Sequence, residues 1–342
     1  MAEPLGVHGA WLRQVEEEIV DPEREIVDPH HHLWRDFGIM GEYLLEDLWA
    51  DTGSGHNIVN TVFLECGAEY HSDSPEYLRP IGETVFVADQ AAQSAKGGPG
   101  KAQISAIVAH ADLRLPSGDG DRLEEVLAAH EEAGRGLFRG IRHAGARDED
   151  PKALMIPGRA PEGLYQDAAF QSGVKRLGRL GYSYDTWHYH HQNLSFAALA
   201  RAVPDTTMVL DHFGTPLGVG RFAGRRAEIF EQWKKDVAEI AACQNVVVKL
   251  GGLAMPDNGF GWSERDLPPT SDEFVEAQAP YYLHMIECFG PERCMFESNF
   301  PVDRVSISYH VLWNGFKKIV GSFSEDEKHA MFRGTASRVY RL

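Results

Sequence analysis

Short apolar segments alternate with longer segments of helical periodicity along most of the chain. The segment 246–248 is three valines and is apolar on both faces, which is typical of a parallel strand covered by helices. In the segment 228–242, apolar residues such as Ile229, Trp233 and Val237 recur at three- and four-residue steps and form one stripe. The predicted strands are 26–30, 60–65, 104–108, 140–144, 182–188, 206–211, 245–249 and 294–297. The predicted helices lie near 44–50, 85–95, 122–133, 168–180, 195–202, 228–242, 273–289 and 309–320.

Eight alternations of strand and helix predict an α/β fold, a (β/α)₈ TIM barrel with an N-terminal helical extension. A doubly wound open sheet is the alternative that this pattern leaves open. Residues 1–25 are the predicted extension, with an amphipathic helix near 10–19, and residues 26–342 are the predicted barrel. Four long loops are candidates to wall a pocket: 66–82, 145–165, 212–227 and 252–272.

Local signals at the ends of the later helices sharpen this prediction. Thr270 and Glu273 have the spacing of a capping box, as do Ser324 and Glu327. Pro280 lies inside the seventh predicted helix, where proline removes a backbone hydrogen bond. We therefore expect helix starts near 271 and 325 and a break or kink at 280.

The composition of the chain indicates which binding partners and which cellular compartment to expect. The chain has 342 residues and a formal net charge of −18, and so acidic a surface repels phosphate backbones. Its four cysteines form no Cys-x-x-Cys pair, which favours reduced thiols over a disulfide or a zinc knuckle. The N-terminus carries no secretion signal, and no stretch approaches the ~20 apolar residues that span a bilayer. We expect a soluble, cytoplasmic protein with a small-molecule substrate, no nucleic acid or membrane partner, and a homodimer as the common default.

Histidines gather at the predicted carboxyl ends of the strands, where TIM-barrel enzymes carry their working residues. His30 and His32 are two apart on an extended strand, so their side chains point to the same face. Such a pair can bind one divalent metal ion, and His190 and His212 could complete the shell from strands five and six. A single His-x-His is weak evidence, because histidines often only satisfy hydrogen bonds in a core. The additional histidines strengthen the interpretation.

Five motifs carry a resemblance to a known family. The segment Ile26-Val-Asp-Pro-His30-His-His32-Leu-Trp34 opens the predicted barrel. The others follow in order: Arg139-Gly-Ile-Arg142-His143, Leu210-Asp-His212-Phe-Gly214, Val248-Lys-Leu-Gly-Gly252 and Arg293-Cys-Met-Phe-Glu-Ser-Asn299-Phe-Pro301-Val-Asp303. In this combination the chain resembles the amidohydrolase-related (family 2) TIM-barrel hydrolases, which include sugar lactonases and aromatic-dicarboxylate lactonases. The resemblance spans roughly residues 10–342.

The resemblance implies a metal site and a substrate pocket. It makes His30, His32, His190 and His212 the metal-type histidines, with a divalent metal ion, Zn²⁺, as the expected cofactor. Some relatives work with one metal or none, so a metal-independent site is the alternative. The residues expected to contact substrate are Glu65, Tyr70, Arg142, His143, Trp187 and Lys249.

Three of these residues have a second interpretation. Arg142 is either a substrate-facing cation or an ion-paired arginine. Lys249 either contacts substrate or neutralises a carboxylate inside the barrel. Glu65 is either a partner for an imidazole or an acceptor for a substrate hydrogen bond.

The eighth strand departs from the family pattern. Relatives have Ser-Asp-x-Pro or Thr-Asp-x-Pro there, and that aspartate activates the attacking water. This chain has Asn299, whose amide has no basic lone pair at neutral pH, although it can orient water or substrate. Either Asp303 or a histidine is then the base, or the reaction needs no base at this position. The catalytic candidates are therefore Arg142, His212, Asn299 and Asp303.

Three functions are weighed against one another. The first is hydrolysis of a lactone, or of a related ester or amide, by an activated water in a histidine-rich mouth. The second is non-oxidative decarboxylation of an aromatic or unsaturated acid, which the missing aspartate disfavours. The third is a binding barrel without catalysis, which Asn299 favours and the retained histidines disfavour. We expect the hydrolase.

Overall fold

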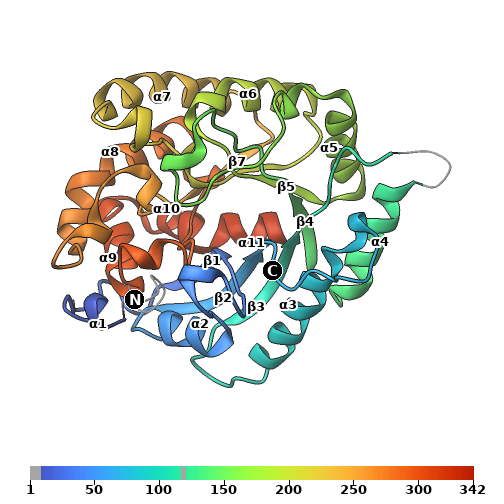
Figure 1. Ribbon diagram of the computed structural model, residues 1–342. Helices are drawn as coiled ribbons and strands as arrows, with labels where there is room; N and C mark the ends of the chain where they lie inside the picture. Colours follow the sequence, from blue (N-terminus) through green and yellow to red (C-terminus); the bar gives the residue numbers. More distant parts are fainter. Residues whose placement is uncertain (1–8, 117–120) are drawn as a thin grey trace.

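The computed structural model describes residues 9–116 and 121–342 (Figure 1). Eight strands form one sheet in which each strand pairs in parallel with the next along the chain. A bridge between His31 and Phe300 joins the first strand to the segment after the last and closes the barrel. The strands are β1 Glu25–His31, β2 Asn57–Leu64, β3 Gln103–Ala109, β4 Phe138–Arg142, β5 Ser183–Thr186, β6 Met208–Leu210, β7 Val246–Leu250 and β8 Cys294–Phe296. The predicted barrel is confirmed, because a doubly wound sheet would reverse its strand order at a switch point.

Helices alternate with the strands and surround them (Figure 1). The helices between and after the strands are α2 Leu45–Thr52, α3 Ile81–Ser94, α4 Arg122–Ala133, α5 Ala168–Leu180, α6 Asn193–Ala202, α7 Arg226–Ala241, α8 Ser271–Phe289 and α9 Tyr309–Ile319. The short helices α1 Gly9–Leu12, α10 Glu325–His329 and α11 Thr335–Tyr340 lie at the two ends of the chain. Each of the eight helices predicted for the barrel is present, with its ends shifted by at most about one turn.

The predicted capping boxes are confirmed, and of the two expectations at Pro280, a break or a kink, the break is wrong. The side chain of Thr270 accepts a hydrogen bond from the backbone of Glu273, and Ser324 does the same with Glu327. Helix α8 runs through Pro280 without interruption. Pro280 is exposed, so water can bond the carbonyl group that loses its N–H partner.

The N-terminal extension is less helical than its sequence predicts. Only Gly9–Leu12 is an α-helix, whereas an amphipathic helix was expected near 10–19. Further along, the carboxylate of Glu17 accepts a hydrogen bond of 2.7 Å from the backbone N–H of Ser271 and one of 3.1 Å from Asn314. The backbone N–H of Val20 donates to the Asn314 side chain at 2.9 Å, and the backbone oxygen of Glu18 accepts from it at 2.9 Å. Contacts with α9 therefore take the place of helical hydrogen bonds in this segment.

The inward-facing side chains are apolar near the start of the later strands and charged near their carboxyl ends. In β7, Val247 belongs to an apolar cluster inside the barrel, whereas Lys249, two residues on, is buried among carboxylates. Met295 in β8 and Glu297, directly after it, repeat this change. The apolar cluster consists of Val27, Val62, Leu64, Ala106, Val108, Val209, Val247 and Met295, with Ala336, Val339 and Tyr340 of α11. Helix α11 therefore covers the amino-terminal end of the barrel, and the polar groups lie at the carboxyl-terminal end.

Two expectations from composition concern the helices and the thiols. Within the described ranges, no helix combines the length and the hydrophobicity needed to cross a membrane. The longest, α8, has 19 residues and carries four acidic side chains. Cys66, Cys243, Cys288 and Cys294 are free, as predicted.

Candidate active site

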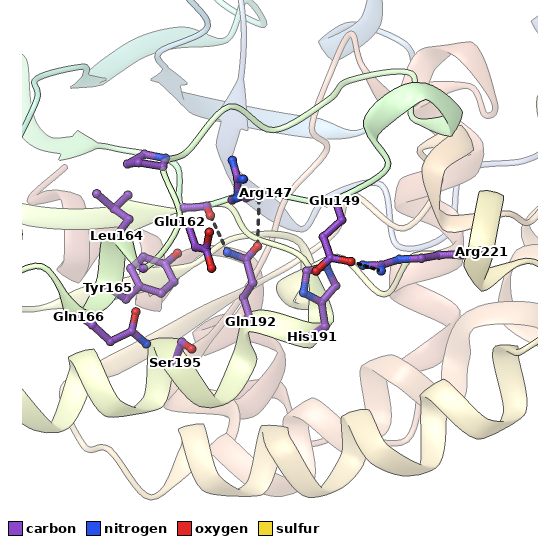
Figure 2. A pocket seen from close by; sticks show the side chains of 13 residues that line it. Arg147, Glu149, Glu162, Leu164, Tyr165, Gln166, His191, Gln192, Ser195 and Arg221 are labelled. Atoms are coloured by element: carbon purple, nitrogen blue, oxygen red, sulfur yellow. Dashed lines mark hydrogen bonds and ion pairs between the residues drawn. The ribbon is translucent and has the colours of Figure 1, made fainter.

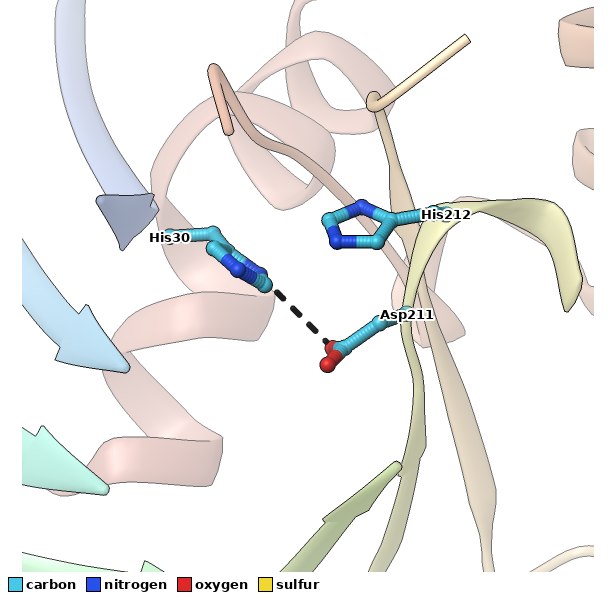
Figure 3. A group of neighbouring side chains, drawn as sticks. All are labelled: His30, Asp211 and His212. Atoms are coloured by element: carbon cyan, nitrogen blue, oxygen red, sulfur yellow. Dashed lines mark ion pairs between the residues drawn. The ribbon is translucent and has the colours of Figure 1, made fainter. Parts of the chain in front are cut away.

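Two histidines and an aspartate meet inside the carboxyl end of the barrel (Figure 3). His30 lies on β1, and Asp211 and His212 directly follow β6. One ligand atom from each of the three lies within 4.8 Å of the others, and all three side chains are buried. Strand periodicity turns Asp211 inward, two positions after Val209, whereas His30 lies three positions after the inward-facing Val27 and is brought inward by an irregularity in β1 between Asp28 and His31. His212 has a positive φ of 53°, which starts the turn after β6.

Glu297, at the end of β8, contacts both imidazoles. Its Oε2 lies 2.7 Å from Nδ1 of His30, and its Oε1 lies 2.7 Å from Nδ1 of His212. The third imidazole, His32, has its Nδ1 2.8 Å from the backbone oxygen of Leu64. Its Nε2 lies 3.3 Å from Nε2 of His30, so the three rings converge.

Two cations complete this buried network. Lys249 Nζ lies 3.0 Å from Asp185 Oδ2 and 3.1 Å from Asp211 Oδ1. Arg142 donates from Nε to Glu65 Oε1 at 2.8 Å, and its Nη1 lies 3.3 Å from His30 Nε2. Both cations are therefore ion-paired, which favours the second interpretation of each, although Arg142 also borders the cavity described below.

Burial governs the protonation of these groups. It lowers the pKa of His212 to about 3 and the pKa values of His30 and His32 well below their usual range, so the imidazoles are neutral at pH 7. It raises the pKa of the Asp211 and Glu297 carboxyl groups, and the Lys249 ammonium opposes that shift. Burial lowers the pKa of Lys249 itself, but Asp211 and Asp185 outweigh burial and raise it.

A cavity of about 490 Å³ opens above this network. Its walls include His32, His212, Arg142 and Asn299, together with the aromatic side chains of Trp34, Phe37, Tyr70 and Trp187. Of the residues predicted to contact substrate, Glu65, Tyr70, Arg142, His143 and Trp187 line it. Lys249 lies below it and is fully buried.

A smaller cavity of about 250 Å³ lies beside the first and contains none of the predicted site residues (Figure 2). Three of its charged or titratable groups, Arg221, Glu149 and His191, have ionic partners. Arg221 lies 3.0 Å from Glu149, and both Arg221 and His191 contact Asp148. The candidate chemistry therefore belongs to the larger cavity.

Two predicted residues lie elsewhere. His190 is on a 3₁₀ turn after β5, where its Nδ1 accepts a hydrogen bond from the backbone of Leu217 at 3.2 Å and its ring packs on Phe222. It therefore does not join His30, Asp211 and His212, which corrects its expected place in the metal shell. The reason is that β5 ends at Thr186, so strand periodicity no longer orients residue 190.

Asp303 lies behind Asn299 and is not part of the cavity wall. Its Oδ1 accepts a hydrogen bond of 2.8 Å from the Asn299 amide, and its Oδ2 accepts one of 3.1 Å from the backbone of Ala254. With both oxygens engaged and 1% of the residue exposed, Asp303 does not fit the predicted role of a base that contacts water.

Three buried carboxylates received no role from the sequence: Asp185, Asp211 and Glu297. The inward alternation of the strands was a usable signal for them. Val209 and Met295 face the apolar cluster, so the residues two positions on, Asp211 and Glu297, must face the same interior.

The donor set fits a divalent metal ion. Two imidazoles and a carboxylate are borderline and hard donors of the kind that hold zinc and similar ions. Both carboxylate oxygens of Asp211 are buried and accept no hydrogen bond from the described residues. Oδ1 is ion-paired with Lys249 at 3.1 Å, and Oδ2 lies 3.6 Å from Arg142, so Oδ2 is the less engaged of the two oxygens. Asn299 adds no anionic ligand, so the set holds one carboxylate beside the two imidazoles.

Comparisons with known proteins agree with this geometry. The amidohydrolase family model matches residues 27–342. The chain is 32% identical over 338 residues to the uncharacterized protein y4mH of Sinorhizobium fredii, covering 93% of this chain and 98% of that protein. It is 27% identical over 330 residues to L-fucono-1,5-lactonase of Burkholderia multivorans, covering 92% and 96%. The crystal structure of an amidohydrolase from Burkholderia multivorans with bound zinc has a TM-score of 0.71 at 25% identity, covering 93% and 100%.

Proposed function

The chain belongs to the amidohydrolase family of hydrolases, and from this premise we propose that it opens a lactone or hydrolyses a related ester or amide. One observation carries the proposal: His30, Asp211 and His212 converge at the floor of the larger cavity, with Arg142 beside them. The similarity to an L-fucono-1,5-lactonase supports a cyclic ester as the substrate class.

Hydrolysis of an ester needs a polarised carbonyl group and a positioned water. His30, Asp211 and His212 would hold a divalent metal ion, which would supply a Lewis acid and lower the pKa of bound water. The zinc in the Burkholderia amidohydrolase supports Zn²⁺ as this ion. The Arg142 guanidinium, held by Glu65, supplies N–H donors toward an oxygen of the substrate.

Asn299 takes the place of the aspartate expected in strand eight. Its Nδ2 donates to Asp303, so the amide is held in one orientation, with the side chain at the cavity wall. We assign Asn299 the orientation of water or substrate and Asp303 the positioning of Asn299. The remaining candidate to accept the proton of the attacking water is His32, which lines the cavity and is not one of the three residues proposed to hold the metal ion.

The aromatic part of the cavity wall suits a ring. Trp34 and Phe37 stack on one another with ring centroids 4.5 Å apart, and Tyr70 and Trp187 also line the cavity. Flat aromatic faces pack well against sugar or pyrone rings. A compact cyclic ester therefore fits better than an extended chain.

The test is a panel of sugar lactones, aromatic lactones and simple esters, assayed on metal-free and zinc-reloaded protein. The His212→Ala variant is expected to lower kcat/KM on the best substrate by about 10³-fold or more, equivalent to roughly 4 kcal/mol of transition-state stabilisation. Circular dichroism and thermal unfolding verify that the variant folds.

A matched control is His284→Ala. His284 lies on α8, bonds the backbone oxygen of Lys234 and takes no part in the cavity. It should keep activity within about threefold. Full activity of His212→Ala, or release of carbon dioxide in place of a ring-opened acid, would reject the proposed reaction.

A further inference from the structure

Two further histidines, His110 and His143, lie side by side in the wall of the larger cavity. His110 follows β3 and His143 follows β4, and these two strands are neighbours in the sheet. The centroids of the two rings lie 5.3 Å apart in a T-shaped arrangement. Both residues line the cavity and stand apart from the three residues proposed to hold the metal ion. Their rings are therefore placed to contact the substrate itself.

The backbone determines which nitrogen of each ring carries a hydrogen. Nδ1 of His110 lies 3.0 Å from the backbone oxygen of Arg142, which can only accept, so this Nδ1 must be the donor. The backbone N–H of Leu113 donates to Nδ1 of His143 at 3.2 Å, so this Nδ1 must be unprotonated. In the neutral rings, Nε2 of His110 then has a lone pair, whereas Nε2 of His143 has a hydrogen.

A nearby carboxylate leaves this assignment unchanged. Oδ1 of Asp112 lies 3.8 Å from Nδ1 of His143, which is beyond hydrogen-bond distance. Asp112 accepts instead from the guanidinium of Arg114, through contacts of 2.9 and 2.7 Å. Burial lowers the pKa of His143, so its ring is neutral at pH 7 and has its single hydrogen on Nε2.

The two rings together offer one acceptor and one donor to a ligand. Nδ1 of each ring is engaged by the backbone, so Nε2 is the nitrogen left for the substrate. Among the substituents of a lactone ring, a hydroxyl group both donates and accepts, so it can bond both nitrogens. A carboxylate can only accept, and it would meet the lone pair of His110.

The arginines of the cavity wall favour the same kind of substituent. Arg114 is paired with Asp112 and Arg142 with Glu65, so each guanidinium is already neutralised by a carboxylate. Arg159 also lines the cavity, but it is exposed, where an ion pair contributes little.

We propose that His110 and His143 bind a hydroxyl group of the substrate ring, with His110 accepting and His143 donating. The pair would select a neutral, hydroxylated ring over a ring that carries carboxylates, because a site built to bond a hydroxyl group rejects analogues that lack it. That this ring is a lactone rests on the proposed function, whereas the hydroxyl site itself does not.

The first experiment is nitrogen-15 NMR of the imidazoles in the full-length wild type, with resonances assigned by replacing each histidine singly. We expect Nδ1–H on His110 and Nε2–H on His143. Cyclic ethers are then added as probes, because they cannot be hydrolysed. The 1,5-anhydrohexitols carry hydroxyl groups, tetrahydropyran carries none, and tetrahydropyran-4-carboxylate carries a carboxylate. At millimolar concentration the hexitols should shift both Nε2 resonances, and the other two probes should not.

The second experiment removes one Nε2 at a time. Asparagine can replace Nδ1 of either ring but has no atom in the place of Nε2. His110→Asn and His143→Asn should each weaken hexitol binding by about 10- to 100-fold and lower kcat/KM on D-glucono-1,5-lactone by a similar factor. On δ-valerolactone, which has no hydroxyl group, kcat/KM should stay within about threefold. The matched control is His191→Asn, at the smaller cavity, which should change none of these values.

Nε2–H on His110 or Nδ1–H on His143 in the wild type would overturn the proposal, and this result needs no variant to fold. Equal losses on the two lactones would also overturn it, as would binding of the carboxylate probe in place of the hexitols or no binding of any hexitol. Hexitol binding by a protein that hydrolyses no lactone or ester would reject the proposed function and leave the hydroxyl site standing.

Discussion

At the amino-terminal end of the barrel the inward-facing residues include Val209, Val247 and Met295, whereas two positions further along the chain, in or directly after the same strands, they are Asp211, Lys249 and Glu297. Both sets are buried, and both belong to one cylinder of strands. The apolar set packs against α11, and the charged set pairs with imidazoles and with one another. The side chains at the two ends are equally buried and differ only in being apolar at one end and charged at the other.

This difference separates stability from function within single strands. Burying valine or methionine stabilises the fold by about 1.5–3 kcal/mol per side chain. Burying an ion costs several kcal/mol, which its partners offset only in part. A cluster of buried ions at the carboxyl end is therefore not explained by stability, and it indicates selection for the reaction at the mouth.

The largest effect on stability is expected at Lys249. Lys249→Met leaves Asp185 and Asp211 buried without their shared cation, so the free energy of unfolding should fall by roughly 3–5 kcal/mol. Urea unfolding measures it. The surface variant Lys318→Met, which breaks the pair with Asp272, should cost about 1 kcal/mol or less. Equal losses in the two variants would remove the distinction between the charged end and ordinary surface pairs.

A smaller loss, without loss of activity, is expected at the apolar end. Val247→Ala removes two buried carbon atoms and leaves a cavity beside α11, so the free energy of unfolding should fall by about 2 kcal/mol. The kcat/KM of the variant should stay within about threefold of the wild type. A tenfold loss of kcat/KM at a temperature where the variant is folded would show that the two ends are not separate.

The smallest effect on stability is expected where the apolar end of the barrel contacts the charged end. The hydroxyl of Tyr340, on α11, donates to Asp185 Oδ2 at 2.5 Å, and the same carboxylate oxygen contacts Lys249. Tyr340→Phe removes one hydrogen bond and keeps the ring, so stability should fall by about 1–2 kcal/mol. Thermal unfolding of the variant beside Val247→Ala ranks the two, and a larger loss at Tyr340 would mean that the charged network depends on α11.

Strand residues were predictable to the extent that alternation governs them. The two-residue period predicted that His30 and His32 share one face of their strand, and the same rule identifies Asp211 and Glu297 as inward-facing, two positions after Val209 and Met295. It does not predict that His30 faces the interior, because β1 is irregular between Asp28 and His31. Where the chain leaves the sheet, the two-residue period no longer predicts which way a side chain points. His190 follows a strand that ends at Thr186, and Asp303 follows the turn at Asn299, whose φ is +56°. Their positions depend on loop contacts with Leu217 and Ala254, which no local pattern encodes.

The bridge between His31 and Phe300 joins the earliest strand of the barrel to nearly the last segment that the chain contributes to it. The backbone of Asn299 also donates to the oxygen of His30, so the seam runs through the site. During synthesis on a ribosome, His30 is translated long before Glu297, so its partner is absent while most of the chain is made. The nascent polypeptide therefore has no complete site until the segment that contains Glu297 and Phe300 has been translated, and only the closed barrel can catalyse the reaction.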